Sequence, residues 1–99
     1  MDFERIESFE WDEGNARKSV EKHGVSQSEA EQPFFNATLL VSEDVRHSDV
    51  EPRFHALGQT DAGRLLHLTF TLRAEGTRIR VISARDMSRK ERNRYEQED

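Results

Sequence analysis

The 99-residue sequence contains no cysteine. A disulfide framework and a thiolate metal site are therefore excluded, and a reducing compartment such as the cytoplasm is the expected location. The N-terminal segment, residues 1–9, is acidic and has no apolar run, so it has the pattern of neither a signal peptide nor a membrane span. A Gly-rich phosphate loop and a nucleophile elbow are also missing, which argues against the enzyme classes that depend on them.

Apolar residues are scarce. They make up 33% of the chain, whereas charged residues make up 35%. A chain of this length forms one domain, residues 1–99, and buries roughly 60–70% of the surface that its unfolded form exposes, so its core must be small. The net charge of −5 argues against wholesale non-specific binding to nucleic acid but permits a local basic patch.

Positive charge is concentrated in the last third of the chain. Residues 64–96 hold nine of the 15 Lys and Arg residues but only four of the 20 Asp and Glu residues. This asymmetry is typical of a site for an anionic polymer.

The start of the chain predicts a short strand over residues 6–11, at a sheet edge, where its charges discourage misplaced pairing. Asp12 can cap a helix that runs to about Lys22. His23-Gly24 should end this helix, because glycine readily takes the left-handed conformation that follows a helix.

A capping box over residues 26–29 predicts a second helix immediately afterwards. This helix should stop or kink near Glu31, because Pro33 removes a backbone donor and crowds the preceding turn. A buried strand is then expected over residues 38–42, followed by a polar loop over residues 43–52.

The clearest pattern is a three-stranded meander, with strands at residues 53–60, 64–72 and 78–84. Asp61-Ala62-Gly63 suits a three-residue hairpin loop, and a four-residue loop joins the second strand to the third. Pairing across both loops places one set of residues on the core face: Phe54, Ala56, Gly58, Leu66, Leu68, Phe70, Ile79, Val81 and Ser83.

The opposite face of this meander carries polar rows. Arg53 and Arg80 should flank Thr71, a combination of two planar guanidinium groups and a hydroxyl that suits a phosphate. The next rows are expected to be His55, Thr69 and Ile82, then Leu57, His67 and Ala84. An ordinary solvated face with charged cross-strand neighbours would give the same pattern.

A basic C-terminal helix closes the chain. Ser88 and Glu91 form a second capping box, so the helix should begin near Ser88 and continue to Tyr95. Arg85 lies just ahead of it and extends the basic surface. A solvated basic helix end is the alternative interpretation.

An ordered set of short motifs resembles the BrnT family of type II toxin–antitoxin systems. The motifs are F-E-W-D (9–12), K-H-G-V-S (22–26), F-F (34–35), R-H-S (46–48), G-R-L-L (63–66), R-I-R-V-I-S-A-R (78–85) and R-K-E-R-N-R-Y-E (89–96). The resemblance implies a RelE-like α+β fold: a small antiparallel sheet, two N-terminal helices packed on one face and a C-terminal helix.

The resemblance also implies a function. A BrnT-like protein is expected to be an endoribonuclease that blocks translation, uses no cofactor and is neutralised by a BrnA-like antitoxin. That antitoxin carries a ribbon-helix-helix part, so operator DNA would be bound only through it, and no membrane partner is implied. The sequence departs from the family pattern at His55 and His67, where aliphatic residues are expected, and at Gln32-Pro33 in the second helix.

Metal-free RNA cleavage needs a base, an acid and groups that stabilise charge on the phosphate. His23 lies in a matching family motif, and histidine is the residue type suited to proton transfer near neutral pH, so it is the candidate base or acid. The other candidate catalytic residues are Arg64, Arg80 and Tyr95, and the candidate phosphate-binding residues are Lys22, Arg53, Thr71 and Arg85.

Each assignment has a simpler alternative. His23 could be a helix-capping histidine, Tyr95 a packing residue and Arg64 a charge at a hairpin end. A metal site at Asp44, His47 and Asp49 has no established ligand spacing, so none is predicted. The competing function is a non-catalytic module whose basic face binds RNA or an acidic partner.

Overall fold

The chain folds into an α+β structure built around one five-stranded sheet. The computed structural model describes residues 3–47 and 51–98. The sheet has the order β1-β5-β4-β3-β2. Its strands are β1 (Ser8–Trp11), β2 (Leu40–Glu43), β3 (Arg53–Gln59), β4 (Leu65–Arg73) and β5 (Arg78–Asp86). The helices are α1 (Glu13–His23), α2 (Gln27–Glu31) and α3 (Arg89–Glu98), with 3-10 turns η1 (Phe3–Arg5), η2 (Gln32–Phe35) and η3 (Val45–His47).

The sheet is mixed, so the predicted purely antiparallel sheet is wrong. β1 pairs parallel to β5, with Phe9 opposite Ile79, whereas the other neighbours pair antiparallel. The alternating pattern of β1 predicted an edge strand, which is confirmed, but alternation does not encode strand direction. β2 is the other edge strand and is only half-buried, so the expected buried strand at this point is also wrong.

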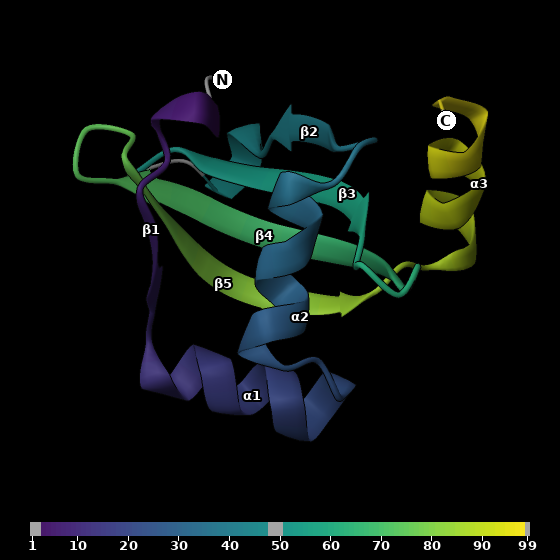
Figure 1. Cartoon of the computed structure of the whole chain (residues 1–99), viewed down its shortest axis with the longest axis horizontal. Coiled ribbons are helices and arrows are strands. Elements are labelled where there is room, and N and C mark those ends of the chain that lie inside the picture. The colour runs from purple at the N-terminus through teal and green to yellow at the C-terminus, as the bar shows by residue number, and fades with distance from the viewer. Residues whose placement is uncertain (1–2, 48–50, 99) are drawn as a thin grey trace.

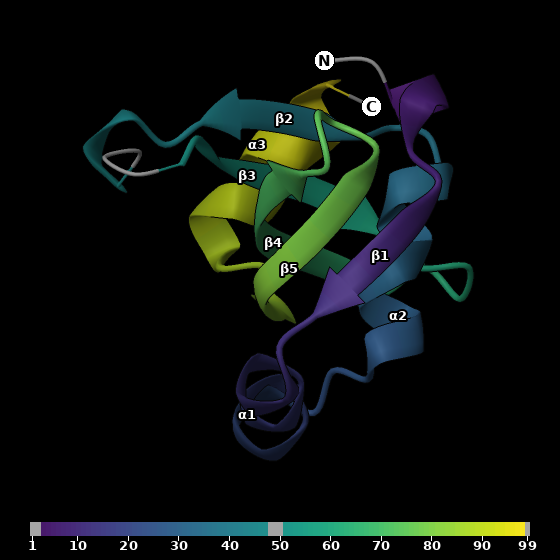
Figure 2. The same ribbon diagram turned by 90° about the vertical axis from the view of Figure 1, so that its left-hand side faces the viewer.

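The two N-terminal helices do not lie together on one face. α2 crosses one face of the sheet, α3 lies on the other side, and α1 lies beyond β5, which it contacts (Figure 1, Figure 2). The core lies between α2 with η2 and the sheet, where Phe34 meets Phe70 edge-on at 5.1 Å between ring centroids. None of the helices described here is long and apolar enough to cross a membrane.

The predicted ends of α1 and α2 are confirmed, whereas α3 continues past its predicted end at Tyr95 to Glu98. The Asp12 side chain accepts hydrogen bonds from two backbone N–H groups of the first turn of α1, and Gly24 follows that helix with a φ of 64°. Ser26 and Glu29 form the predicted capping box of α2. The α-helix stops at Glu31, as Pro33 predicted, and the chain continues as the 3-10 turn η2.

The predicted register of β3 with β4 is confirmed from Arg53 opposite Thr71 onward. The register of β4 with β5 is confirmed only as far as Val81, because a bulge follows and Ile82 has no partner in the ladder. A bulge inserts one residue and reverses the faces of everything after it.

As a result Ser83, not Ile82, pairs with Thr69, and the expected core position of Ser83 is wrong. Ala84 turns into the core, where it is fully buried, and so does not share the row of Leu57 and His67. Arg85 takes that place on the other face.

Candidate functional site

The face of the sheet opposite the Phe70 core carries the polar groups of interest, and we call it the outer face. Its rows across β3, β4 and β5 are Arg53, Thr71 and Arg80; His55, Thr69 and Ser83; and Leu57, His67 and Arg85. Successive rows are two residues apart along β3 and β4, which is roughly 7 Å, whereas the bulge makes the first step on β5 three residues, from Arg80 to Ser83. The rows therefore run from the two arginines, through His55, to a last row that holds both His67 and Arg85, and the bulge is what brings Arg85 to this face.

The first row has the predicted order and borders a small hollow. The hollow has a volume of about 180 Å³ and is lined by Asn15, Glu51, Arg53, Thr71, Arg80 and Ile82. Arg80 donates to Asp12 over 3.4 Å, with the two side chains 26% and 46% exposed. Such a partly exposed pair contributes little to stability, so an incoming anion can compete for the guanidinium.

The Thr71 hydroxyl is not free to donate a hydrogen bond to a phosphate, although the sequence pattern suggested that it was. The residue is 2% exposed. Its hydroxyl donates to the backbone carbonyl of Pro52, which satisfies the side chain inside the protein. The two arginines of this row are therefore its candidate phosphate ligands.

The next two rows form a second hollow, which we call the histidine hollow. It has a volume of about 380 Å³ and is lined by Leu40, Ser42, His55, Leu57, His67, Arg85, Glu91 and Arg94. The rings of His55 and His67 lie 5.0 Å apart between centroids. Sequence reasoning placed both histidines on this face but did not bring Arg85 and Glu91 to them.

His55 is held at both nitrogens. Its Nε2 lies 2.9 Å from Asp44 Oδ2, and its Nδ1 lies 3.1 Å from the Thr69 hydroxyl. Asp44 therefore belongs to this histidine rather than to the metal alternative, another member of which, Asp49, lies outside the described residues. Within the described part of the chain, no group of three or more His, Asp or Glu side chains is arranged to hold a metal ion.

His67 is the more buried of the two, with 9% of the residue exposed. Burial lowers the pKa of His67 to about 4, and the nearby charge of Arg85 acts in the same direction. Its Nδ1 has no hydrogen-bond partner, and its Nε2 lies 3.8 Å from Glu91 Oε2, which is too far for a hydrogen bond. The ring is therefore neutral near pH 7.

Arg85 and Glu91 form a two-pronged ion pair at the edge of the histidine hollow. The guanidinium donates to both carboxylate oxygens, at 2.8 and 2.9 Å. These bonds, with the backbone N–H of Ser88, lower the pKa of Glu91 to about 2. The sequence predicted the capping box. It did not predict that the capping box also orients Glu91 toward Arg85, because the bulge that places Arg85 on this face was missed.

Arg64 is built into the framework. Its guanidinium donates to Asp86, to Glu29 and to the backbone carbonyls of His23 and Gly24. The hydrogen bond to Asp86 raises the pKa of Arg64 further above its usual value. One side chain thus links the hairpin end, α1, α2 and the end of β5, so Arg64 is suited to positioning rather than to contacting a phosphate.

His23 and Arg80 lie at opposite ends of α1. Arg80 contacts Asp12, which caps the start of the helix, whereas His23 is its last residue. Eleven helical residues span roughly 16 Å. His23 and Arg80 therefore cannot act on the same phosphate in this arrangement, although Lys22 lies beside His23 and is exposed.

Tyr95 is a packing residue in this structure. It is 2% exposed and packs with Leu57 and Met87. Its hydroxyl donates to the backbone carbonyl of Thr38 over 2.6 Å, which attaches α3 to the segment before β2. A ring buried in this way cannot stack on a base.

The exposed cations of α3 differ from the arginines of the sheet. Arg89, Lys90, Arg92 and Arg94 form no salt bridge with any described residue. Arg94 also lines the histidine hollow. These side chains are available to an anionic chain without displacing a carboxylate.

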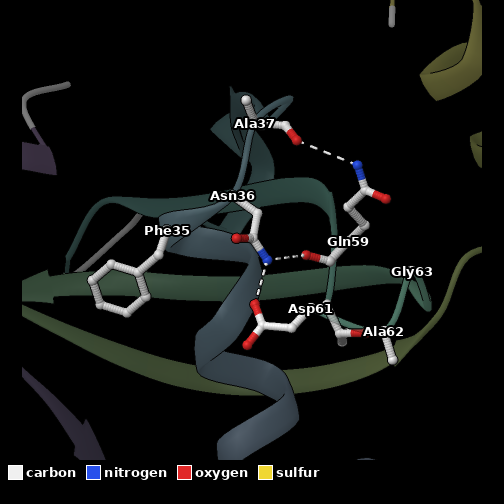
Figure 3. A pocket seen from close by; sticks show the side chains of 8 residues that line it. Phe35, Asn36, Ala37, Gln59, Asp61, Ala62 and Gly63 are labelled. Carbon is white, nitrogen blue, oxygen red and sulfur yellow. Dashed lines mark hydrogen bonds between the residues drawn. The ribbon is translucent and has the colours of Figure 1, made fainter.

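A third hollow, of about 570 Å³, lies where η2 meets the β3–β4 turn (Figure 3). Asn36 donates there to the Asp61 carboxylate and to the Gln59 carbonyl, and Phe35 is 75% exposed beside them. No Lys or Arg lines it, and the Asp61 carboxylate would repel a phosphate. This hollow is therefore not a candidate phosphate site.

Comparison with solved structures identifies the class of fold. The chain is similar to the 1.1 Å crystal structure of the ribonuclease toxin BrnT of Brucella abortus, with a TM-score of 0.61 and 20% sequence identity. The similarity covers 83% of this chain and 97% of that chain. At this identity the likeness shows a shared fold.

The sequence itself identifies the family. Residues 11–91 match the family described as "Ribonuclease toxin, BrnT, of type II toxin-antitoxin system". The match spans most of the chain, and the protein therefore belongs to the BrnT family of ribonuclease toxins. No curated protein matches the sequence.

Proposed function

We propose that this protein is an endoribonuclease toxin that cuts RNA without a metal ion and thereby inhibits translation in the cytoplasm. The observation that carries the proposal is the outer face, which presents Arg53 and Arg80 in one row and Arg85 in another. Guanidinium groups can stabilise the charge that grows on the phosphate during cleavage.

The family motif residues keep a place in the proposal. His23, with Lys22 beside it, is proposed as the acid or base only for a phosphate bound at the end of α1, apart from the one that Arg80 contacts. Arg64 is proposed as a positioning residue, because its contacts order the end of α1 that carries His23. Thr71 and Tyr95 are left out of the site, because their hydroxyls are bonded to backbone carbonyls and both residues are buried.

The proposed partner is a BrnA-like antitoxin with a ribbon-helix-helix part that binds operator DNA. A type II toxin has a protein antitoxin, and an acidic segment of it would be attracted to the exposed cations of α3. We also propose that the fold is RelE-like. Gel filtration of the co-expressed pair should show one stable complex, and two separate peaks would contradict this part of the proposal.

The activity can be tested with the purified chain and total RNA in EDTA. Cleavage is expected, and Arg80→Ala should slow it by roughly 10²–10³, the usual cost of removing one charge-stabilising donor. His23→Ala should slow it by roughly 10²–10⁴ if His23 transfers a proton. An unchanged rate would remove the substituted residue from the site, and intact RNA with the wild-type chain would refute the enzyme.

A non-catalytic module is the second candidate. Arg80 and Arg85 are each paired with a carboxylate, so both are satisfied without RNA. In that case the chain would bind RNA or a partner tightly in the same assay and leave the RNA intact.

A further inference from the structure

We propose that the histidine hollow binds the scissile phosphodiester of RNA and that His55 and His67 transfer its protons. This inference rests on the proposed function, which it deepens by naming the groups that exchange protons. Neither histidine belongs to the motifs that carry the family resemblance, so the pair would be a device of this chain.

The geometry of the hollow supports the pair. The two rings lie 5.0 Å apart between centroids, so both can reach one phosphate group. Arg85 and Arg94 line the same hollow and supply positive charge. His23, by contrast, lies at the far end of α1 from Arg80, whereas His55 is one row away from Arg80 on the sheet.

The two histidines are prepared for different steps. His67 is neutral and has no hydrogen bond at Nε2, so this nitrogen can accept the proton of a ribose 2′-hydroxyl. Nε2 of His55 lies 2.9 Å from Asp44 Oδ2, so this nitrogen is already engaged by a carboxylate. The proton that His55 can donate is therefore the one on Nδ1, whose other contact is the Thr69 hydroxyl.

The reaction balances without a further reactant. The 2′-oxygen forms a bond to phosphorus as its proton passes to His67. The bond from phosphorus to the 5′-oxygen breaks, and His55 gives its proton to that oxygen. The products are a 2′,3′-cyclic phosphate and a 5′-hydroxyl end, and a water molecule can restore the proton balance between the two rings.

Occupancy of the hollow should change the acid–base behaviour of His67. The charged groups that face its ring are Arg85 from β5, Glu91 from α3 and His55 from β3. A bound phosphodiester adds a negative charge, which offsets the positive charge of Arg85. This change favours the protonated form of the His67 ring. The pKa of His67 should therefore rise on binding by about one pH unit, a tenfold gain in proton affinity.

The binding experiment uses the wild-type chain and a 2′-O-methyl RNA oligonucleotide, which has no 2′-hydroxyl to attack and so cannot be cut. The ring Cε1–H signals of the histidines are followed by NMR between pH 3 and pH 8, with and without the oligonucleotide. The signals are assigned with His55→Gln and His67→Gln. A higher midpoint for His67 is expected, and unchanged signals for both His55 and His67 would overturn the inference.

The kinetic experiment separates the inference from the proposed function. His55→Gln and His67→Gln should each slow RNA cleavage about 100-fold or more, and each should remove one limb of the pH–rate profile. Val20→Ala, on the exposed surface of α1, is the control and should cleave at the wild-type rate. Circular dichroism shows whether each variant is folded.

Two outcomes are distinct. Wild-type rates and profiles in both glutamine variants would refute the histidine pair and leave the proposed function intact. Intact RNA with the wild-type chain would refute the proposed function and the proton transfer together. In that last case the NMR titration, which needs no substitution, still decides whether the hollow binds RNA.

Discussion

The buried, neutral state of His67 predicts a specific loss of stability in acid. Its pKa is about 4 in the folded protein, against an ordinary value of 6.5. Between these values the unfolded chain binds a proton that the native ring does not, so stability falls as the pH falls from about 6.5 to about 4. At about 1.4 kcal/mol per pH unit the full effect is about 3 kcal/mol, of which about 2 kcal/mol is lost by pH 4.5.

Urea denaturation followed by circular dichroism at pH 7.0, 6.0, 5.0 and 4.5 measures this loss, and His67→Gln should remove about 2 kcal/mol of it. The series ends at pH 4.5 so that protonation of Glu91 contributes little to the measured loss of stability. The pKa of this carboxyl is about 2 in the folded protein and 4.5 ordinarily, so most of its effect falls below pH 4.5. Leu57→Met is the control: it lines the same hollow, carries no titrating group and costs less than about 1.5 kcal/mol, so its curve should run parallel to the wild type. Equal slopes for wild type and His67→Gln would refute the reasoning.

Three further predictions concern the framework. Tyr95→Phe removes the bond to the Thr38 carbonyl and should cost about 1–3 kcal/mol in thermal unfolding while leaving RNA cleavage per folded molecule unchanged; a specific loss of cleavage would restore Tyr95 to the site. Arg64→Met should lower the free energy of unfolding by about 2 kcal/mol, because two carboxylates and two carbonyls lose a charged donor; an unchanged urea midpoint would contradict the structure. Gly58→Ala would place a Cβ 2.9 Å from Pro33 Cβ and should cost about 1–3 kcal/mol, whereas a stabilised variant would show that η2 yields easily.

Local signals in the sequence predicted the features that depend on nearby residues. The caps at Asp12 and Ser26 are set by side chains that bond to their own helix, and the β3–β4 register is set by a three-residue loop and strict alternation. The parallel pairing of β1 with β5 depends on chain segments about 70 residues apart, and no local pattern carries that information.

The bulge in β5 was missed, although the sequence contained a sign of it. Unbroken alternation would have turned Ser83 into the core and Ala84 outward, which is the less favourable choice for both residues. Shifting the inward–outward alternation of side chains by one residue after Val81 turns Ala84 into the core and Ser83 to the outer face. The structure has this arrangement. Because the error lay just before Arg85, the prediction named Arg85 as a phosphate ligand but did not place it beside His67.

Pairing between arginines and carboxylates on the outer face changes what a salt titration would report. A phosphate that binds Arg80 or Arg85 displaces the carboxylate of Asp12 or Glu91. At an unpaired arginine it would displace dissolved anions instead. The carboxylate then needs a counterion of its own, so fewer ions are set free in total. The affinity for RNA should therefore fall less steeply with ionic strength than a count of guanidinium groups would imply.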